Sequence, residues 1–429
     1  MSSLYIHIPF CVSRCIYCGF YSTTLLELQD RYVDALCREM DLRFSIISQQ
    51  SSLSTIYLGG GTPSQLSANN LQKLFDKLSH LFSLSSHLEI TMEVNPDDVT
   101  EQFAKELQTL PVNRVSMGVQ TFSNDRLRFL HRRHTAEQIP IAIARLRKAG
   151  IKNISIDLMF GFPGETMEEW QTDICKALEL DIEHISAYSL MYEEGTPLYD
   201  MMVESRESRV EGPLPLAPCS LLLAPISEDT EREMYYELID RLEAAGYEHY
   251  EISNFAKRKT QSQKKAKGQG RESFRSRHNS NYWNGTYYIG IGAAAHSYYM
   301  SRGSLTPNPS PQGEGDIDRS RVEGRETLYR SWNVADLHAY IESIENGVIP
   351  CEKEIINDDT RYNDIITTAL RTREGIILPS LQPKYRHYLL DNARTALDNG
   401  LLVIENEHIH LTRAGLFVSD DVMSDLIWL

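Results

Sequence analysis

The sequence LYIHIPFCVSRCIYC, residues 4–18, carries the strongest signal in this chain. It joins a short β-rich run, Leu4–Ile8, to three cysteines, Cys11, Cys15 and Cys18. A loop of this length can present three thiolates to one side of a cuboidal 4Fe–4S cluster, whereas a helix or a strand would spread them along its axis. Such clusters normally take four cysteines, so three leave one iron open to a small molecule that offers an amino group and a carboxylate.

The same spacing also fits a structural zinc site, with His7 as a fourth ligand. His7 lies inside the expected first strand, where a buried and hydrogen-bonded histidine is the simpler interpretation. The remaining cysteines are expected to be small buried or half-buried thiols rather than disulfide partners. They are Cys37, Cys175, Cys219 and Cys351.

Short strands alternate with helices through the first two hundred residues. Five further β-rich runs follow the first at roughly even intervals: Thr55–Leu58, Leu88–Val94, Arg114–Val119, Asn153–Leu158 and His184–Leu190. Between them apolar residues recur with helical spacing, for example after the expected N-cap Ser67 and before the expected C-terminal glycine Gly150. Alternating strands and helices predict a parallel sheet with right-handed crossovers, and six such units predict an α/β fold of the partial (β/α)6, TIM-like barrel type.

An unusual motif follows five of these six strands. In chain order they are Cys11–Cys18, GGGTP at 59–63, EVNP at 93–96, GVQ at 118–120, and Asp157 before GFPG at 161–164. Function in a barrel of this type sits at the C-terminal ends of the strands. The motifs are therefore expected to meet at one edge of the sheet.

The rest of the chain is less regular. Residues 1–200 are expected to form the barrel core, and residues 201–332 to complete it around three insertions. The insertions, at about 201–225, 257–275 and 302–326, are rich in Ser, Arg, Gly, Pro and Glu and are expected to be mostly disordered. Residues 333–429 are expected to form a small C-terminal α/β domain of winged-helix size, with β-rich runs at 401–404 and 408–411.

The overall charge argues against nucleic acid as a partner, because the formal net charge is −16 and phosphate binding needs a basic surface. One basic stretch, Lys257–Arg277, is expected to be a solvated loop. The chain opens with neither the basic segment nor the apolar core of a signal peptide. Its apolar runs are too short to span a bilayer. A cytoplasmic protein without a membrane span is expected.

With Phe10, Tyr17 and Gly19 around its cysteines, the loop resembles the signature of the radical S-adenosylmethionine (radical SAM) superfamily. The resemblance extends over about residues 4–300. The segment LYIHIPFC at 4–11 also resembles the opening of the oxygen-independent coproporphyrinogen III oxidase family, which includes true oxidases and HemW-type haem chaperones. The resemblance implies a radical SAM barrel, with a 4Fe–4S cluster on the three cysteines and S-adenosylmethionine on the open iron.

The family's contacts with S-adenosylmethionine map onto strand ends of this chain. Gly60, Gly61 and Thr62 match the segment that binds the methionyl end, where glycines let backbone amides approach a ligand. Without the resemblance, a tight strand-to-helix turn explains these glycines equally well. The other matching positions are Tyr5, Glu93, Gln120, Arg132 and Asp157. Carboxylates at such positions can accept from ammonium or hydroxyl groups, and an arginine can pair with a carboxylate.

Three features separate the oxidases from the chaperones. The true oxidases of this family carry a further cysteine at the position of Phe20 in this chain. They also have an N-terminal extension before the first strand, where this chain has three residues. The segment HNSNYW at 278–283 matches the HNxxYW motif of HemW-type chaperones, and YEISNF at 250–255 is similar to that branch as well. Four residues of the HNSNYW segment are therefore candidates to bind haem: His278, Asn279, Tyr282 and Trp283.

The chemistry of this segment suits a porphyrin. Imidazole can ligate haem iron or bond a propionate, and aromatic rings can pack on the macrocycle. In the alternative interpretation, the two aromatic residues belong to the core and His278 is a buried histidine whose hydrogen bonds are made within the protein. Other histidines, His131, His134 and His296, remain candidate ligands.

The sequence therefore favours a haem chaperone that binds haem, passes it to an acceptor protein and receives electrons from a donor to its cluster. It leaves open whether the chain is itself an enzyme. The alternatives are an oxygen-independent coproporphyrinogen III oxidase, which performs radical oxidative decarboxylation, and a radical enzyme acting on another substrate.

Overall fold

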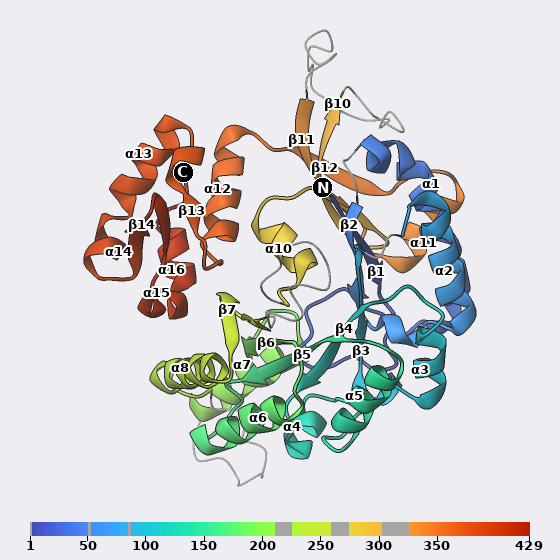
Figure 1. Cartoon of the computed structure of the whole chain (residues 1–429), viewed down its shortest axis with the longest axis horizontal. Coiled ribbons are helices and arrows are strands. Elements are labelled where there is room, and N and C mark those ends of the chain that lie inside the picture. Colours follow the sequence, from blue (N-terminus) through green and yellow to red (C-terminus); the bar gives the residue numbers. More distant parts are fainter. Residues whose placement is uncertain (1, 50–52, 85–86, 211–224, 259–273, 303–325) are drawn as a thin grey trace. The chain divides into compact units, whose positions relative to one another are not determined.

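The computed structural model describes residues 2–49, 53–84, 87–210, 225–258, 274–302 and 326–429 (Figure 1). These residues form two compact units, and each unit combines segments that are distant in sequence. The first unit comprises Met1–Phe10, Leu25–Thr91 and Arg277–Leu429. The second unit comprises Cys11–Thr24 and Met92–Ser276. The boundary between them falls within strand β3, Glu89–Val94.

The first unit contains a mixed sheet whose strands lie in the order β12-β11-β10-β9-β1-β2. Strand β1 pairs in parallel with β2 on one side and with β9 on the other, and the strands beyond β9 are antiparallel. The bounds are β1 Ser2–Ile8, β2 Leu53–Gly60, β9 Tyr288–Ile291, β10 His296–Arg302, β11 Glu326–Asn333 and β12 Cys351–Ile355.

Figure 1 shows helices α1, Gln29–Gln49, α2, Ala68–Leu81, and α11, Leu337–Glu345, beside strands β1 and β2. Helix α1 packs against both α2 and α11. Ser67 caps α2 as expected, because its hydroxyl accepts a hydrogen bond from the backbone N of Asn70.

A buried polar network joins α1, β11 and α11. Arg43 pairs with Glu39 at 2.7 Å and donates to Asn333 at 2.7 Å. The Glu39 carboxylate also accepts from Asn333 at 2.8 Å and from the Tyr340 hydroxyl at 2.6 Å. A buried ion pair is tolerated when further hydrogen bonds satisfy it, as these do.

The C-terminal part of the first unit is a small α/β region in which helices surround a three-stranded antiparallel sheet of order β13-β15-β14 (Figure 1, red). Its elements are α12 Asp358–Ala369, β13 Ile376–Ile377, α13 Pro383–Asn392, α14 Arg394–Asp398, β14 Leu402–Glu405, β15 His408–Leu411, α15 Arg413–Phe417 and α16 Ser419–Ser424. Rings of Tyr362, Tyr385, Tyr388 and Trp428 pack together in its core. The expected strands at 401–404 and 408–411 are both present.

The second unit is built on a sheet whose strands lie in the order β4-β5-β6-β8-β7. Strands β4, β5 and β6 are parallel, and β8 and β7 continue the sheet antiparallel. The strands are β4 Arg114–Gln120, β5 Asn153–Phe160, β6 His184–Ser189, β7 Tyr247–Glu251 and β8 Asn254–Lys257. The helices are α3 Glu101–Leu107, α4 Asn124–Phe129, α5 Gln138–Lys148, α6 Met167–Glu179, α7 Pro197–Val210 and α8 Glu228–Ala244.

Short single-turn 3₁₀ helices complete the secondary structure. They span Leu26–Leu28, Pro63–Gln65, Pro96–Asp98 and Leu378–Ser380. All six strands expected in the first two hundred residues are present, and the predicted α/β class with parallel strands is confirmed. The expected domain limits at 200 and 332 remain predictions.

The three expected insertions lie mostly outside the described residues. The first insertion is an exception at its start, because residues 201–210 belong to α7 and are helical rather than irregular. The basic stretch 257–277 is described only near its ends, where Lys257 pairs with Asp181 and Arg275 pairs with Glu248 at 2.7 Å.

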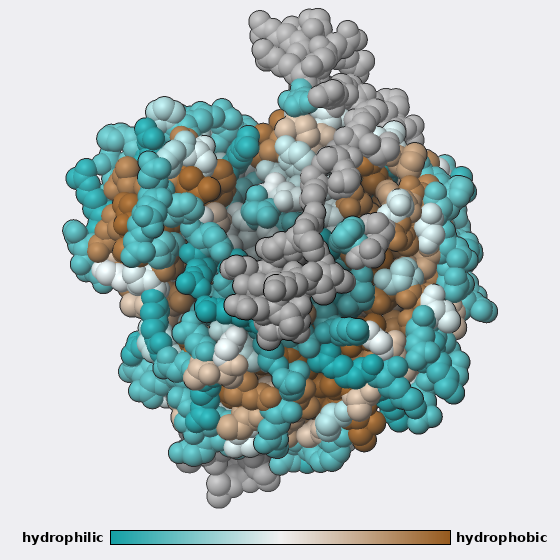
Figure 2. Space-filling view, viewed as in Figure 1, coloured by the Kyte–Doolittle hydropathy of each residue, from teal (hydrophilic) through white to brown (hydrophobic). Residues whose placement is uncertain are grey.

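Within the described ranges, no helix combines the length and the apolar character needed to cross a membrane. The face drawn in Figure 2 is mainly hydrophilic, and its hydrophobic side chains lie in separate patches. This agrees with a chain in which 24% of the residues are charged.

Candidate functional site

The cysteine loop belongs to the second unit and is anchored by backbone hydrogen bonds. The backbone N of Cys11 donates to the carbonyl of Thr23 at 2.9 Å, and the N of Ile16 donates to the carbonyl of Leu130 at 3.3 Å. The carbonyl of Ile16 in turn accepts from the N of Leu198 at 3.0 Å. The middle of the loop is therefore held from both sides.

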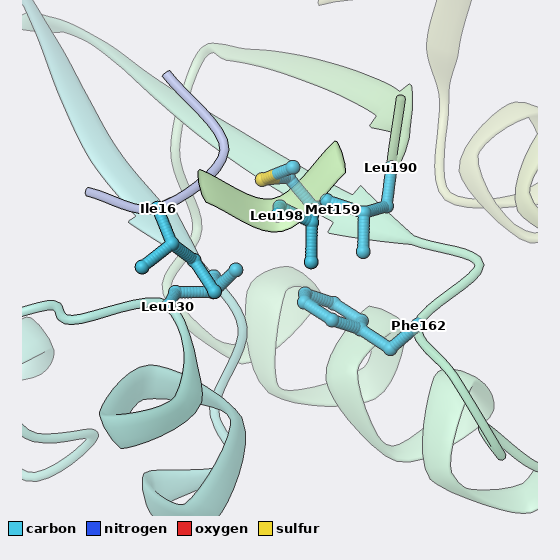
Figure 3. Close-up of a cluster of buried hydrophobic side chains, with 6 residues drawn as sticks. All are labelled: Ile16, Leu130, Met159, Phe162, Leu190 and Leu198. Atoms are coloured by element: carbon cyan, nitrogen blue, oxygen red, sulfur yellow. The ribbon is translucent and has the colours of Figure 1, made fainter. Parts of the chain in front are cut away.

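Ile16 also anchors the loop by its side chain, which is only 4% exposed. Figure 3 shows it in a hydrophobic cluster that comes from several elements of the second unit. The other members are Leu130, Met159, Phe162, Leu190 and Leu198. Because Ile16 lies between Cys15 and Cys18, this packing fixes the part of the loop that carries those two thiols.

The three thiols are half-buried, and none of them forms a disulfide in the described structure. Burial raises the pKa of the Cys18 thiol above its usual value. A buried thiol of this kind becomes a thiolate readily only when a metal replaces its proton. Among the described residues, no three His, Cys, Asp or Glu side chains are grouped as ligands of a single metal ion.

Arg132 joins the loop to two strand ends. Its Nη1 lies 3.7 Å from the Sγ of Cys15, and its Nη2 donates to Asn95 Oδ1 at 2.6 Å and to the carbonyl of Gly118 at 2.5 Å. Its Nε is buried and has no hydrogen-bond partner in the part of the chain that the structure describes. The guanidinium therefore keeps one donor for a ligand.

Gln120 lies beside Arg132 at the end of β4. Its backbone has a φ of +67°, in the left-handed region, and the pairing of β4 with β5 shifts register between Gly118 and Gln120. A Cβ at Gly118 would lie 2.9 Å from Gln120 Nε2 and 3.1 Å from Arg132 Nη2. The bulge and this glycine let the two side chains share the strand end, and backbone strain of this kind is typical of functional sites.

Asp157 stands in the same row of the sheet, opposite Gly118 of β4 and Ser186 of β6. Burial raises its pKa to about 6, although Arg114 opposes the shift. Its Oδ1 accepts from the Ser116 hydroxyl at 3.5 Å. The carboxylate is therefore held by strand neighbours in a poorly solvated position.

The glycine segment after β2 belongs to the first unit and packs against β1. Gly60 has a φ of +108°, and a Cβ there would lie 2.3 Å from the ring of His7. The backbone N of Gly61 donates to the carbonyl of Ile8, and that of Thr62 to the carbonyl of Phe10, both at 2.8 Å. These two amides are therefore committed to the backbone, whereas the sequence suggested that they face a ligand.

His7 is buried, and its Nδ1 is 2.9 Å from the hydroxyl of Tyr5. This matches the interpretation of His7 as a hydrogen-bonded core residue. Tyr5, Gly60, Gly61 and Thr62 thus gather in the first unit. The second unit brings together the cysteines with Gln120, Arg132 and Asp157, and it also holds the half-buried Glu93 on β3.

The HNSNYW segment forms helix α10, Arg277–Trp283, in the first unit. His278 is 1% exposed, and both of its ring nitrogens are engaged: Nδ1 with Thr55 Oγ1 at 2.8 Å and Nε2 with the Tyr282 hydroxyl at 2.9 Å. Its ring also stacks on Tyr57 at 4.9 Å between centroids. Iron ligation by His278 would first require breaking one of these bonds.

Trp283 offers a different kind of contact. Its Nε1 is buried without a hydrogen-bond partner among the residues described, and the guanidinium of Arg371 lies 5.0 Å from the ring centroid. Asn279 is half-buried on the same helix. Sequence reasoning missed Thr55, Tyr57 and Arg371, because nothing near them in the chain marks them.

The other candidate histidines have different surroundings. Burial lowers the pKa of His134 to about 3, and its Nε2 lies 3.2 Å from the carbonyl of Val119. Burial also lowers the pKa of His296, whose ring stacks on Trp332. His131 is exposed, with a φ of +60°.

Comparison with known proteins gives the class first. The family model of the radical SAM superfamily matches residues 5–174. The fold is similar to that of coproporphyrinogen III oxidase from Escherichia coli, described as a radical SAM enzyme, with a TM-score of 0.74 and 19% identity over 99% of this chain and 90% of that chain. Fold and thiol loop together define a radical SAM protein.

The particular family follows from similarity over nearly the whole length. The chain is 39% identical to the heme chaperone HemW of Bacillus subtilis, with 98% of each chain covered. It is 32% identical to the heme chaperone HemW of Lactococcus lactis, covering 99% of this chain and 97% of that one. The chain belongs to the HemW family of heme chaperones.

Proposed function

We propose that this chain holds a 4Fe–4S cluster on Cys11, Cys15 and Cys18, binds S-adenosylmethionine beside it, and binds haem for transfer to an acceptor protein. The observation that carries the proposal is the full-length similarity to HemW heme chaperones of two bacteria. An electron donor would reduce the cluster.

The second unit fits a cluster and its nucleoside. Three thiols that form no disulfide lie on one anchored loop, and an arginine donor already faces one of them. A reduced cluster beside S-adenosylmethionine supplies an electron for cleavage of the sulfonium. In this arrangement the unpartnered Nε of Arg132 would donate to the ligand's carboxylate, and Gln120 would offer its amide.

Asp157 and Glu93 would complete the cofactor contacts that the second unit offers. Asp157 would accept from hydroxyl groups of the ribose, and its poor solvation would strengthen such hydrogen bonds. Among the candidate contacts of the first unit, Thr62 and Tyr5 offer side-chain hydroxyls, whereas the amides of Gly61 and Thr62 already bond the backbone.

The first unit fits haem through aromatic faces and donors to propionates. The rings of Tyr57, His278 and Tyr282 pack as one group, with His278 to Tyr282 centroids 5.0 Å apart. Haem carries two carboxylates, which favour arginine and indole donors. Arg371 and the unpartnered Nε1 of Trp283 supply both kinds of donor side by side.

One residue supports the chaperone over the oxidase. Phe20, which stands where the oxidases carry a further cysteine, is 71% exposed and cannot act as a thiolate ligand. The similarity to coproporphyrinogen III oxidase extends to the fold, whereas the similarity to HemW chaperones extends to 39% identical residues.

Haem titration of anaerobically reconstituted protein tests the proposal. We expect iron and sulfide in the purified protein and a saturable Soret band at micromolar haem. Arg371→Gln should weaken haem binding about tenfold, as loss of a hydrogen bond to a charged group does. Arg373→Gln is the matched control, because Arg373 is exposed two residues away.

Haem dimethyl ester, which lacks free carboxylates, is the second probe. It should bind the wild type and Arg371→Gln equally. Equal haem affinity in the two arginine variants would place the propionates elsewhere. Absence of haem binding, or efficient conversion of coproporphyrinogen III to protoporphyrinogen with S-adenosylmethionine and a reductant, would contradict the chaperone function. Zinc in place of iron and sulfide would contradict the cluster.

A further inference from the structure

The thiol of Cys15 has two polar neighbours. Arg132 Nη1 lies 3.7 Å from its Sγ, a normal length for a hydrogen bond to sulfur. The hydroxyl of Tyr17 also interacts electrostatically with this thiol. Both residues lie in the second unit, and Tyr17 packs beside the hydrophobic cluster that anchors the loop.

The position of Arg132 is fixed independently of any ligand. Its Nη2 donates to Asn95 and to the carbonyl of Gly118, and its backbone N donates to the carbonyl of Leu127 at 2.8 Å. The guanidinium is planar, so fixing Nη2 also fixes the direction of Nη1. Nη1 is thereby held toward Cys15 rather than left to sample the solvent.

A donor in this place has a defined effect on a cluster. One-electron reduction adds negative charge to the cluster and its thiolates without making or breaking a bond. Hydrogen bonds to the sulfurs and nearby positive charge stabilise the reduced form and raise the reduction potential. The same contact has no reason to matter for the affinity of haem.

We propose that Arg132 is a positioning residue that raises the reduction potential of the 4Fe–4S cluster by donating a hydrogen bond to the Cys15 thiolate, with the Tyr17 hydroxyl as a second polar neighbour of that thiolate. This inference rests on the cluster of the proposed function. It gives Arg132 a role beyond contact with S-adenosylmethionine, through a different nitrogen of the same guanidinium.

The test is a redox titration without S-adenosylmethionine, so that any role of Arg132 in binding it cannot contribute. A dithionite titration monitored by electron paramagnetic resonance gives the midpoint potential. Arg132→Gln should lower the equilibrium constant for reduction about tenfold, equivalent to about 59 mV for one electron. Arg132→Lys, which keeps the charge without the planar fork, should fall between this variant and the wild type.

Arg133→Gln is the matched control. It removes the same charge from the adjacent residue, which pairs with Asp97 at 2.8 Å and Asp98 at 2.7 Å instead of with a thiol. Its potential should stay close to that of the wild type. If Arg132→Gln has full iron and sulfide and the wild-type potential, or if both variants shift equally, the inference is wrong.

Tyr17→Phe keeps the inference testable if Arg132→Gln assembles no cluster. This variant retains the packing of the ring and removes only the hydroxyl. A lowered potential, with a shift of the iron–thiolate stretching bands in resonance Raman spectra, supports the inference. An unchanged potential, or loss of the cluster in both variants, overturns it. A wild-type protein without iron and sulfide would instead refute the proposed function.

Discussion

Gly60→Ala should destabilise the chain more than an ordinary glycine substitution. Gly60 has a φ of +108°, so an L-residue there is strained, and its Cβ would lie 2.3 Å from the His7 ring. That ring cannot move aside cheaply, because it is buried and hydrogen-bonded to Tyr5. The left-handed backbone costs about 1–2 kcal/mol. Overpacking adds about 1–3 kcal/mol.

Gly150→Ala provides the matched control. Gly150 has a similar φ of +93°, but nothing lies within 4 Å of the position that its Cβ would take. The control should therefore lose only the backbone component, about 1–2 kcal/mol. The difference between the two variants isolates the contact with His7.

Chemical denaturation of the metal-free protein measures both free energies of unfolding, provided the transitions are cooperative. We expect Gly60→Ala to lose about 1–3 kcal/mol more than Gly150→Ala. Adding His7→Ala should remove most of this excess, because the clashing ring is then absent. Equal losses in the two glycine variants, or no rescue by the second substitution, would refute the reasoning.

Two further predictions concern buried charges. Arg43→Ala should cost about 3–5 kcal/mol of unfolding free energy, because it leaves Glu39 buried without its cation. Arg31→Ala, which removes an exposed partner of Glu345, should cost less than about 1 kcal/mol in the same denaturation experiment. Burial raises the pKa of Glu165 from 4.5 to about 7, so the folded state holds this proton more tightly than the unfolded state. The contribution of Glu165 to the free energy of unfolding therefore falls as pH rises from 4.5 to 7. Glu165→Gln should flatten the pH dependence of that free energy in this window. An unchanged slope would contradict the raised pKa of Glu165.

Much of the fold could be predicted because it is recorded locally. The runs rich in Val, Ile and aromatic residues became β1 to β6 within a few residues of their expected ends. Ser67 and Gly150 mark helix ends by capping chemistry that involves only neighbouring residues. The prediction of an irregular insertion from residue 201 was wrong at its start, where α7 continues to Val210. The polar composition of this segment gave no sign of the helix.

The chemistry of single atoms could not be predicted in the same way. Cys15 and Arg132 are 117 residues apart, and their contact depends on the bulge at the end of β4. The glycines at 60 and 61 suggested amides open to a ligand, but the register of β1 beside β2 brings the carbonyl of Ile8 within bonding distance of Gly61. The sequence did not settle whether His278 ligates iron or belongs to the core, whereas the structure places Thr55 Oγ1 and the Tyr282 hydroxyl on its two ring nitrogens.

Spacing and periodicity thus predicted the three-thiol loop and the parallel strands, because these depend on residue types at short separations. The class of chemistry was implied by the resemblance to a known family, since the spacing of the cysteines alone also fits zinc. Packing determined which donors are already used and which remain for a ligand: Arg132 Nε and Trp283 Nε1 lack partners in the described structure, whereas the Gly61 amide has one. The physical reason is that a hydrogen bond requires two groups within about 3 Å, and the register and packing of distant segments set that distance.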